Sequence, residues 1–246
     1  MHRLTLSLVL MMFATTSLAQ TLAAEYRAGN DPASEGWRVA NVPDETQAGL
    51  LDDDGTPAWF ARYGINYSLT GTAEEVAEAA AGGFVLRAVV RAVGDLDLDP
   101  VAPVHIEPHG SKIWYVNDDR MFMLRLGTDA AGDLHLSPMM DWFDDRVTFV
   151  VAGSGDGYHD IQIAQNPVSG LADIIVDGSV VYRRWGGSDR GRGGTGFGSG
   201  WGWGVGCEGC QLNVNLFQCW VDREVPVSGE SKSFGALKSL FGSQSK

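Results

Sequence analysis

The chain has 246 residues, of which 31 are acidic and 18 are basic, so its formal net charge at pH 7 is −13. So acidic a surface repels nucleic acid and anionic membranes, and it suits a neutral ligand, a cation or no charged ligand. A chain of this length commonly forms one β-rich domain, and no internal repeat indicates a solenoid or a propeller.

The first 19 residues predict a cleaved export signal. His2 and Arg3 precede an apolar run at 4–14, and small residues follow it. This order matches the n-region, h-region and cleavage site of a signal peptide. A membrane anchor is the alternative, but the apolar run is shorter than the roughly 20 residues of a spanning helix.

Cleavage fits the sequence after Ala19 and also after Ala24. We therefore expect a secreted protein, periplasmic or extracellular, without a membrane span. The globular domain is predicted at 25–225 and a C-terminal tail at 226–246.

One helix is predicted between turn signals. Thr72 and Glu75 form a capping box, in which each side chain accepts a hydrogen bond from the other residue's amide. Alanine-rich sequence continues the helix to Ala81, and the glycine pair at 82–83 ends it.

The rest of the chain reads as short strands. At 84–91, Phe84, Leu86, Ala88 and Val90 form one wholly apolar face, and valine alternates with arginine on the other, which predicts a strand with one face on a core. Strand-like runs recur along the chain, at 37–39, 59–63, 112–116, 120–126, 133–136, 146–152, 159–165, 172–176, 179–185 and 211–221.

The turns between these runs favour antiparallel pairing. Asp177-Gly178 is a strong hairpin signal, because both residues of a type I′ turn take positive φ. The glycine-rich stretch at 186–206 is predicted as a loop. The predicted fold class is all-β: a two-sheet antiparallel jelly roll, or concanavalin A-like sandwich, with one short helix.

Two adjoining segments carry a family resemblance. The sequence at 156–163 and 167–178 contains Gly157, His159, a Pro-to-Gly turn and Asp177-Gly178. This pattern resembles the core of laminin-G-like and concanavalin A-like lectin domains, including those attached to bacterial sialidases. The resemblance covers roughly 60–222 and implies the sandwich fold, but this fold carries lectins, hydrolases, lyases and structural modules. The acidic motif of the related glucanases is missing, which implies a non-catalytic or unrecognised member.

A carbohydrate site is predicted where aromatic and basic residues gather late in the chain. Trp201 and Trp203 lie in the glycine-rich stretch, where burying both rings is hard to arrange, and sugar rings stack on exposed aromatic planes. Trp185 lies nearby, and Arg183 and Arg190 could bind an acidic sugar. The alternatives are that the rings cap the core and that the arginines form surface ion pairs.

Asp95, Asp97 and Asp99 are spaced by two, so a strand would place three carboxylates on one face. Calcium takes such oxygen ligands, and laminin-G-like domains often hold it at a sheet rim. The alternative is a charged, solvent-facing edge. His105, Glu107 and His109 have the same spacing, so their imidazole and carboxylate groups could converge on a metal ion, and the alternative is a solvent-facing edge strand. No other cofactor is expected.

Cys207, Cys210 and Cys219 are the three cysteines. In an oxidising compartment we expect one disulfide and one odd thiol, with the pairing left open.

Three functions are compatible with these features. The first is a monomeric glycan-binding protein without catalysis. The second is a glycoside hydrolase or polysaccharide lyase on the same fold, and the third is a structural or adhesive envelope module. A groove lined by tryptophan and arginine without acids would favour binding, whereas two facing carboxylates would favour hydrolysis.

Overall fold

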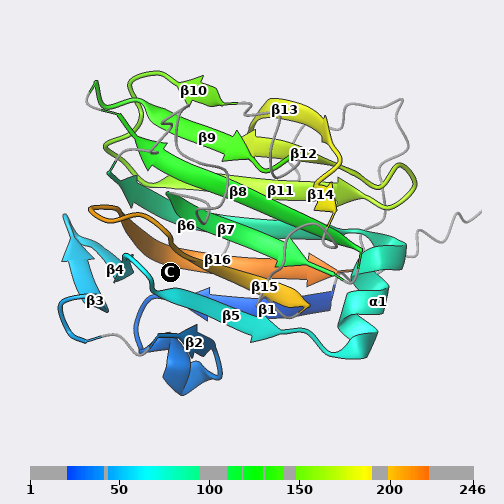
Figure 1. Cartoon of the computed structure of the whole chain (residues 1–246), viewed down its shortest axis with the longest axis horizontal. Helices are drawn as coiled ribbons and strands as arrows, with labels where there is room; N and C mark the ends of the chain where they lie inside the picture. The colour runs from blue at the N-terminus through cyan, green and yellow to red at the C-terminus, as the bar shows by residue number, and fades with distance from the viewer. Residues whose placement is uncertain are drawn as a thin grey trace, which may run out of the picture.

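The computed structural model of the protein describes residues 21–41, 44–94, 110–117, 119–129, 131–140, 148–189 and 199–221. In these ranges the chain forms two antiparallel sheets, one α-helix and one short 3-10 helix at Pro32–Glu35 (Figure 1). The predicted fold class, a two-sheet antiparallel sandwich with one short helix, is confirmed.

Sheet I contains eight of the described strands. They are β1 (Thr21–Arg27), β3 (Ala48–Asp53), β4 (Thr56–Arg62), β6 (Phe84–Val93), β11 (His159–Asn166), β12 (Leu171–Val176), β13 (Ser179–Trp185) and β16 (Gln211–Val221). Their order is β13-β12-β11-β6-β16-β4-β3, and β1 pairs with β16 beside this path.

Sheet II also contains eight described strands. They are β2 (Arg38–Ala40), β5 (Asn66–Thr70), β7 (Ser111–Val116), β8 (Arg120–Thr128), β9 (Leu134–Pro138), β10 (Phe149–Val151), β14 (Ser188–Asp189) and β15 (Gly200–Val205). Their order is β10-β9-β8-β7-β15-β5-β2, and β14 pairs with β8.

The core lies between the sheets, as the period-two pattern predicts. Phe84, Leu86, Ala88 and Val90 of β6 are each at most 1% exposed, and they face the apolar side of sheet II. The opposite face of β6 is partly exposed, and there Arg87 forms an ion pair with Asp160 of β11 at 2.8 Å.

The helix α1 (Ala73–Gly82) lies at one end of the sandwich (Figure 1). Both hydrogen bonds of the predicted capping box form: Glu75 N–H donates to Thr72 Oγ1, and Thr72 N–H donates to the Glu75 carboxylate. Ala79 is buried, and Gly83 ends the helix with a φ of 79°. Within the described residues, no helix has the length and hydrophobicity to cross a bilayer.

The segments that carry the family resemblance form the β11–β12–β13 meander. Asp177 and Gly178 both take positive φ, at 49° and 79°, which confirms the predicted hairpin turn. The Asp177 carboxylate accepts hydrogen bonds from the amide of Asp160 and contacts His159 Nδ1 at 2.7 Å. This part of the resemblance therefore consists of residues that hold a turn against the neighbouring strand.

The expectation of a loop at 186–206 is wrong for part of that stretch. It contains β15, so residues 200–205 form a central strand of sheet II. At the other end of the chain, β1 starts at Thr21, four residues before the position where the domain is predicted to start. Glycine usually weakens strands, but here the glycines alternate with Trp201, Trp203 and Val205, and tertiary packing overrides propensity.

β1 makes one of the two candidate cleavage sites costly. Thr21, Leu22 and Ala24 pair with β16, and Ala24 is 3% exposed. A chain that begins at Glu25 loses these pairings, whereas a chain that begins at Gln20 keeps them. We expect the shorter chain to melt about 5 °C lower, because one or two kcal/mol shifts the melting temperature of a domain this size by a few degrees. Calorimetry of the two truncated variants measures this difference, and equal melting temperatures would contradict a structural role for the start of β1.

Candidate functional site

Trp201 and Trp203 were predicted to be exposed and to form a sugar platform, and this exposure is wrong. Both indoles are 0% exposed and lie on the inner face of β15. The Trp203 ring centroid lies 4.3 Å from that of Trp37 and 5.2 Å from that of Phe217 in sheet I. These rings join the two sheets, so Trp203 has no face left for a sugar.

Tyr67 of β5 belongs to the same cluster. Its ring stacks on Trp203 at 5.5 Å, and its hydroxyl accepts a hydrogen bond from Trp59 Nε1 at 3.0 Å. Burial raises the pKa of Tyr67 to about 12, so the hydroxyl stays neutral at physiological pH. The inner surface of β5 and β15 is thus a closed aromatic core.

The other residues of the predicted carbohydrate site, Trp185, Arg183 and Arg190, do not form a site with the two tryptophans of β15 in the described structure. Trp185 is 0% exposed, packs on Phe122 and donates from Nε1 to the Met139 carbonyl at 3.0 Å. Arg183 is on the surface, with its side chain 71% exposed, and its guanidinium lies 3.5 Å from the Asp173 carboxylate. Arg190 lies outside the described residues.

A groove occupies the outer face of sheet II, opposite the buried tryptophans. One row of cross-strand partners builds it: Arg38 of β2 pairs with Ser68, Ser68 pairs with Gly202, and Gly202 pairs with Trp114 of β7. Cross-strand partners share a face, and Gly202 points outward because Trp201 and Trp203 point inward. Ser68 and Gly202 therefore form a floor between two large side chains. The backbones of Arg38 and Trp114 are three strand spacings, or about 14 Å, apart.

The floor requires glycine. A Cβ atom at Gly202 would overlap the Trp114 indole and the Tyr67 carbonyl oxygen, and one at Gly204 would overlap the Asn66 side chain. The neighbouring side chains thus lean over β15 from both sides.

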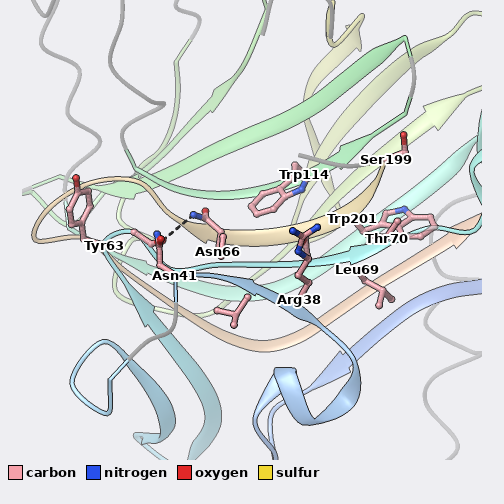
Figure 2. Close-up of a pocket in the computed structure, with 13 residues that line it drawn as sticks. Arg38, Asn41, Tyr63, Asn66, Leu69, Thr70, Trp114, Ser199 and Trp201 are labelled. Carbon is pink, nitrogen blue, oxygen red and sulfur yellow. Dashed lines mark hydrogen bonds between the residues drawn. The ribbon is translucent and has the colours of Figure 1, made fainter. Parts of the chain in front are cut away.

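The groove has a volume of about 440 Å³, which falls in the range of small-ligand pockets. Figure 2 shows its lining residues, with the Arg38 guanidinium and the Trp114 indole on facing sides. The described lining residues are Arg38, Val39, Ala40, Asn41, Tyr63, Gly64, Asn66, Ser68, Leu69, Thr70, Trp114, Ser199 and Trp201.

Several polar groups of the groove have no protein partner. In the described part of the chain, the guanidinium of Arg38 and the hydroxyls of Ser68 and Thr70 make no hydrogen bond or ion pair. Asn41 and Asn66, in contrast, both donate to the Gly64 carbonyl, at 2.8 and 3.2 Å. The groove therefore offers a cation and two hydroxyls to a ligand, on a scaffold held by the two amides.

Tyr63 supplies the exposed aromatic surface of the groove. Its side chain is 55% exposed at the end opposite Thr70 and Ser199 (Figure 2). Trp114 is only 1% exposed, because it packs with Val116, Met121 and other apolar side chains of the outer face. Trp114 forms a wall, and Tyr63 is the ring on which a sugar could stack.

The described lining contains no carboxylate. This is unusual for a chain of net charge −13. Lys112, a further cation of the described chain near this wall, is buried: its Nζ lies 5.8 Å from the Trp114 ring, and the residue is 2% exposed. The described lining therefore lacks the pair of carboxylates that glycoside hydrolysis uses.

His159 and Asp177 resemble part of a catalytic triad but lack a nucleophile. His159 Nε2 faces the backbone carbonyl of Ser154, while the Ser154 hydroxyl donates to the Val151 carbonyl. A triad serine would instead present its hydroxyl to the imidazole. His159 is also 5% exposed, so the pair holds loops together.

A polar network covers part of the outer face of sheet I. Asp53 accepts hydrogen bonds from Arg91 at 2.7 Å, from Tyr158 at 2.9 Å and from Asn213 at 2.7 Å. Burial and the Asp53 carboxylate raise the pKa of Tyr158. Asp53 is fully engaged, so this network stabilises the sheet and offers no free acid.

The predicted calcium ligands Asp95, Asp97 and Asp99 lie outside the described residues, as does the 105–109 stretch. Elsewhere, where the structure describes the chain, no three His, Cys, Asp or Glu side chains gather to hold a metal.

The cysteines form one pair. Cys207 and Cys210 are joined by a disulfide in the turn before β16. Cys219 is a buried thiol in β16, and burial raises its pKa well above the ordinary value. The thiol is therefore unreactive as a nucleophile.

Sequence reasoning missed the groove residues Arg38, Ser68, Thr70 and Tyr63. A signal was present in the strict alternation of glycine with large apolar residues at 200–205 and of polar with apolar residues at 66–70. Both patterns indicate strands with two different faces.

No protein-family model matches the sequence, and no curated protein matches it. Solved structures with a similar fold exist at low sequence identity. A carbohydrate esterase, vb_24B_21, from the Shiga toxin-encoding bacteriophage phi24B is 11% identical, with a TM-score of 0.57 over 83% of this chain and 100% of that one.

Two toxin structures are also similar, each with a TM-score of 0.50 and 10% identity. The match to the binding domain of Paraclostridial Mosquitocidal Protein 1 covers 89% of this chain and 52% of the toxin chain. A structure of botulinum neurotoxin type C, whose cell entry depends on two ganglioside molecules, matches 90% of this chain and 51% of its own. This chain spans about half the length of both toxin chains. At these identities the likeness shows the fold alone.

The buried position of Trp203 leads to a stability prediction. We expect Trp203→Ala to lower the free energy of unfolding by about 3–5 kcal/mol, because it empties the contact between the sheets. Trp203→Phe should cost less, since part of the ring remains. Urea denaturation measures both. Val168→Ala is the matched control, because Val168 is 89% exposed. A Trp203→Ala protein as stable as this control would refute the core assignment.

Proposed function

We propose that this chain is a secreted carbohydrate-binding β-sandwich protein that binds glycan in the groove on sheet II and does not cleave it. The observation that carries the proposal is the groove itself: unpartnered Arg38, Ser68 and Thr70, an exposed Tyr63, and no carboxylate among the described lining residues. Hydroxyls and amides beside an aromatic ring are the groups with which proteins hold sugars.

The fold supports this proposal only in a general way. The similar phage protein is a carbohydrate esterase, and the similar botulinum neurotoxin depends on gangliosides. Sugar recognition thus occurs on related sandwiches with different activities. The laminin-G-like resemblance agrees with this function and stays a prediction.

The enzyme alternative is less favoured. Glycoside hydrolysis uses two carboxylates that flank the scissile bond, and the described groove has none. An ester-hydrolysing triad needs a serine at the imidazole, which the His159 pair lacks. A purely structural module would not need a groove with unpartnered polar groups.

Export, a monomeric state and calcium complete the proposal as predictions. Cleavage after Ala19 agrees with the whole of β1 remaining in the mature protein. Calcium at Asp95, Asp97 and Asp99 is the one cofactor proposed, and the groove does not require it.

A glycan array of neutral and acidic polysaccharides, followed by calorimetric titration of the hits, tests the function. We expect at least one hit, and we expect Tyr63→Ala to weaken it about fivefold, because aromatic stacking contributes roughly 1 kcal/mol. Thr70→Val should also weaken it through the lost hydroxyl. Reducing-sugar release from the same polysaccharide should be absent.

Val168→Ala serves again as the control, since Val168 is exposed in the turn between β11 and β12. Binding to no polysaccharide of the panel would refute the proposal. Binding that neither groove variant weakens would place the site elsewhere.

A further inference from the structure

Arg38 is an exposed arginine at a groove without acidic side chains in its described lining. Four of the nine described arginines lie within 4 Å of a carboxylate oxygen, in the pairs Arg27–Glu25, Arg87–Asp160, Arg91–Asp53 and Arg183–Asp173. Arg38 is not among these four, although the chain has 31 acids for 18 basic residues.

The surroundings of Arg38 suit a bound anion. Arg38 lies directly across from Ser68 in the β2–β5 pair, and Thr70 lies two residues further along β5 on the same face. Both hydroxyls can donate hydrogen bonds to an oxygen held by the guanidinium. Among the described lining residues, no carboxylate competes for the cation or repels an incoming anion.

A guanidinium recognises a planar carboxylate through two parallel N–H···O bonds, which gives geometric selectivity beyond charge. Tyr63 lies at the other end of the groove from Thr70 (Figure 2). A polymer of several sugar rings could therefore place one carboxylate at Arg38 while another ring stacks on Tyr63.

On the basis of the glycan-binding function proposed above, we propose that the groove selects glycans whose sugars carry a carboxylate, and that Arg38 binds this carboxylate in a bidentate manner. The strongly acidic net charge of the chain then acts against non-specific binding of such polymers, so recognition depends on the local cation Arg38.

Matched polymers test this selectivity. Polygalacturonate, alginate, hyaluronate and polysialate are titrated against the full chain at 150 mM salt, each beside a counterpart whose carboxylates are reduced to alcohols. We expect at least one acidic polymer to bind about tenfold more tightly than its reduced counterpart, because a hydrogen-bonded ion pair in a groove contributes at least that factor.

Three arginine variants locate the effect. Arg38→Gln should remove the preference for the carboxylate, and Arg38→Lys should restore only part of it, since lysine keeps the charge without the bidentate geometry. Arg183→Gln should leave the preference unchanged, because Arg183 is an exposed arginine of β13 in the other sheet. Equal melting temperatures of the variants show that the fold is intact.

The outcomes separate this inference from the function on which it rests. Two results would overturn the carboxylate selectivity: equal binding of acidic and reduced polymers, and a preference for the carboxylate that is unchanged in Arg38→Gln. Neither result contradicts the proposed glycan binding. Equal loss in Arg38→Gln and Arg183→Gln also overturns the carboxylate selectivity, because that result reports general electrostatics. Binding to no polymer, acidic or neutral, overturns both proposals.

Discussion

The rest of the structure depends on the two-residue alternation of β15. At every second position this strand places Trp201, Trp203 or Val205 between the sheets, and at the intervening positions it places a glycine on the outer face. The inner side chains join sheet II to the rings of sheet I, and the outer glycines leave the space in which the groove forms. The core and the groove therefore lie on the two opposite faces of β15. A slip of one residue in the β15 pairing would exchange them, with indoles in the groove and glycines in the core.

The parts of the fold that the sequence predicted well are those with local signals. The capping box of Thr72 and Glu75 depends on residues three apart, and the turn at Asp177 and Gly178 depends on two adjacent residues that tolerate positive φ. The strand β16 has an unbroken β-rich run, so its predicted bounds agree with the structure. The strand β15 lacks such a β-rich composition, because half of its residues are glycines, and its local signal is only the alternation of glycine with large apolar residues. It forms a strand because tertiary contacts of its tryptophans outweigh the weak propensity of its backbone.

The groove was harder to predict for a topological reason. Arg38, Ser68, Trp114 and Gly202 come from strands far apart in the sequence, and only the sheet order places them in one row. Antiparallel sheets with long connections bring together residues whose separation carries no spacing motif. The exposure of Trp201 and Trp203 was predicted wrongly because their neighbouring glycines were taken as a sign of exposure. Glycines opposite large side chains are instead a sign of close packing. The groove in the structure combines an arginine with aromatic residues, but these are Arg38, Tyr63 and Trp114, and they differ from the residues predicted from the sequence.

The family resemblance and the candidate site lie on different sheets, and this separation has a physical meaning. His159 and Asp177 connect the β12–β13 turn to the loop before β11, so these hydrogen bonds constrain their identity in this chain. Residues under such a constraint can persist while the ligand changes. The groove residues make no comparable stabilising contacts. The polar groups of Arg38, Ser68 and Thr70 and the exposed ring of Tyr63 have few partners within the described chain. The first set therefore stabilises the fold through its hydrogen bonds, whereas the described structure gives the second set no comparable stabilising contacts. Specificity in a protein of this architecture is best sought on the outer face of sheet II, where the fold itself imposes the least.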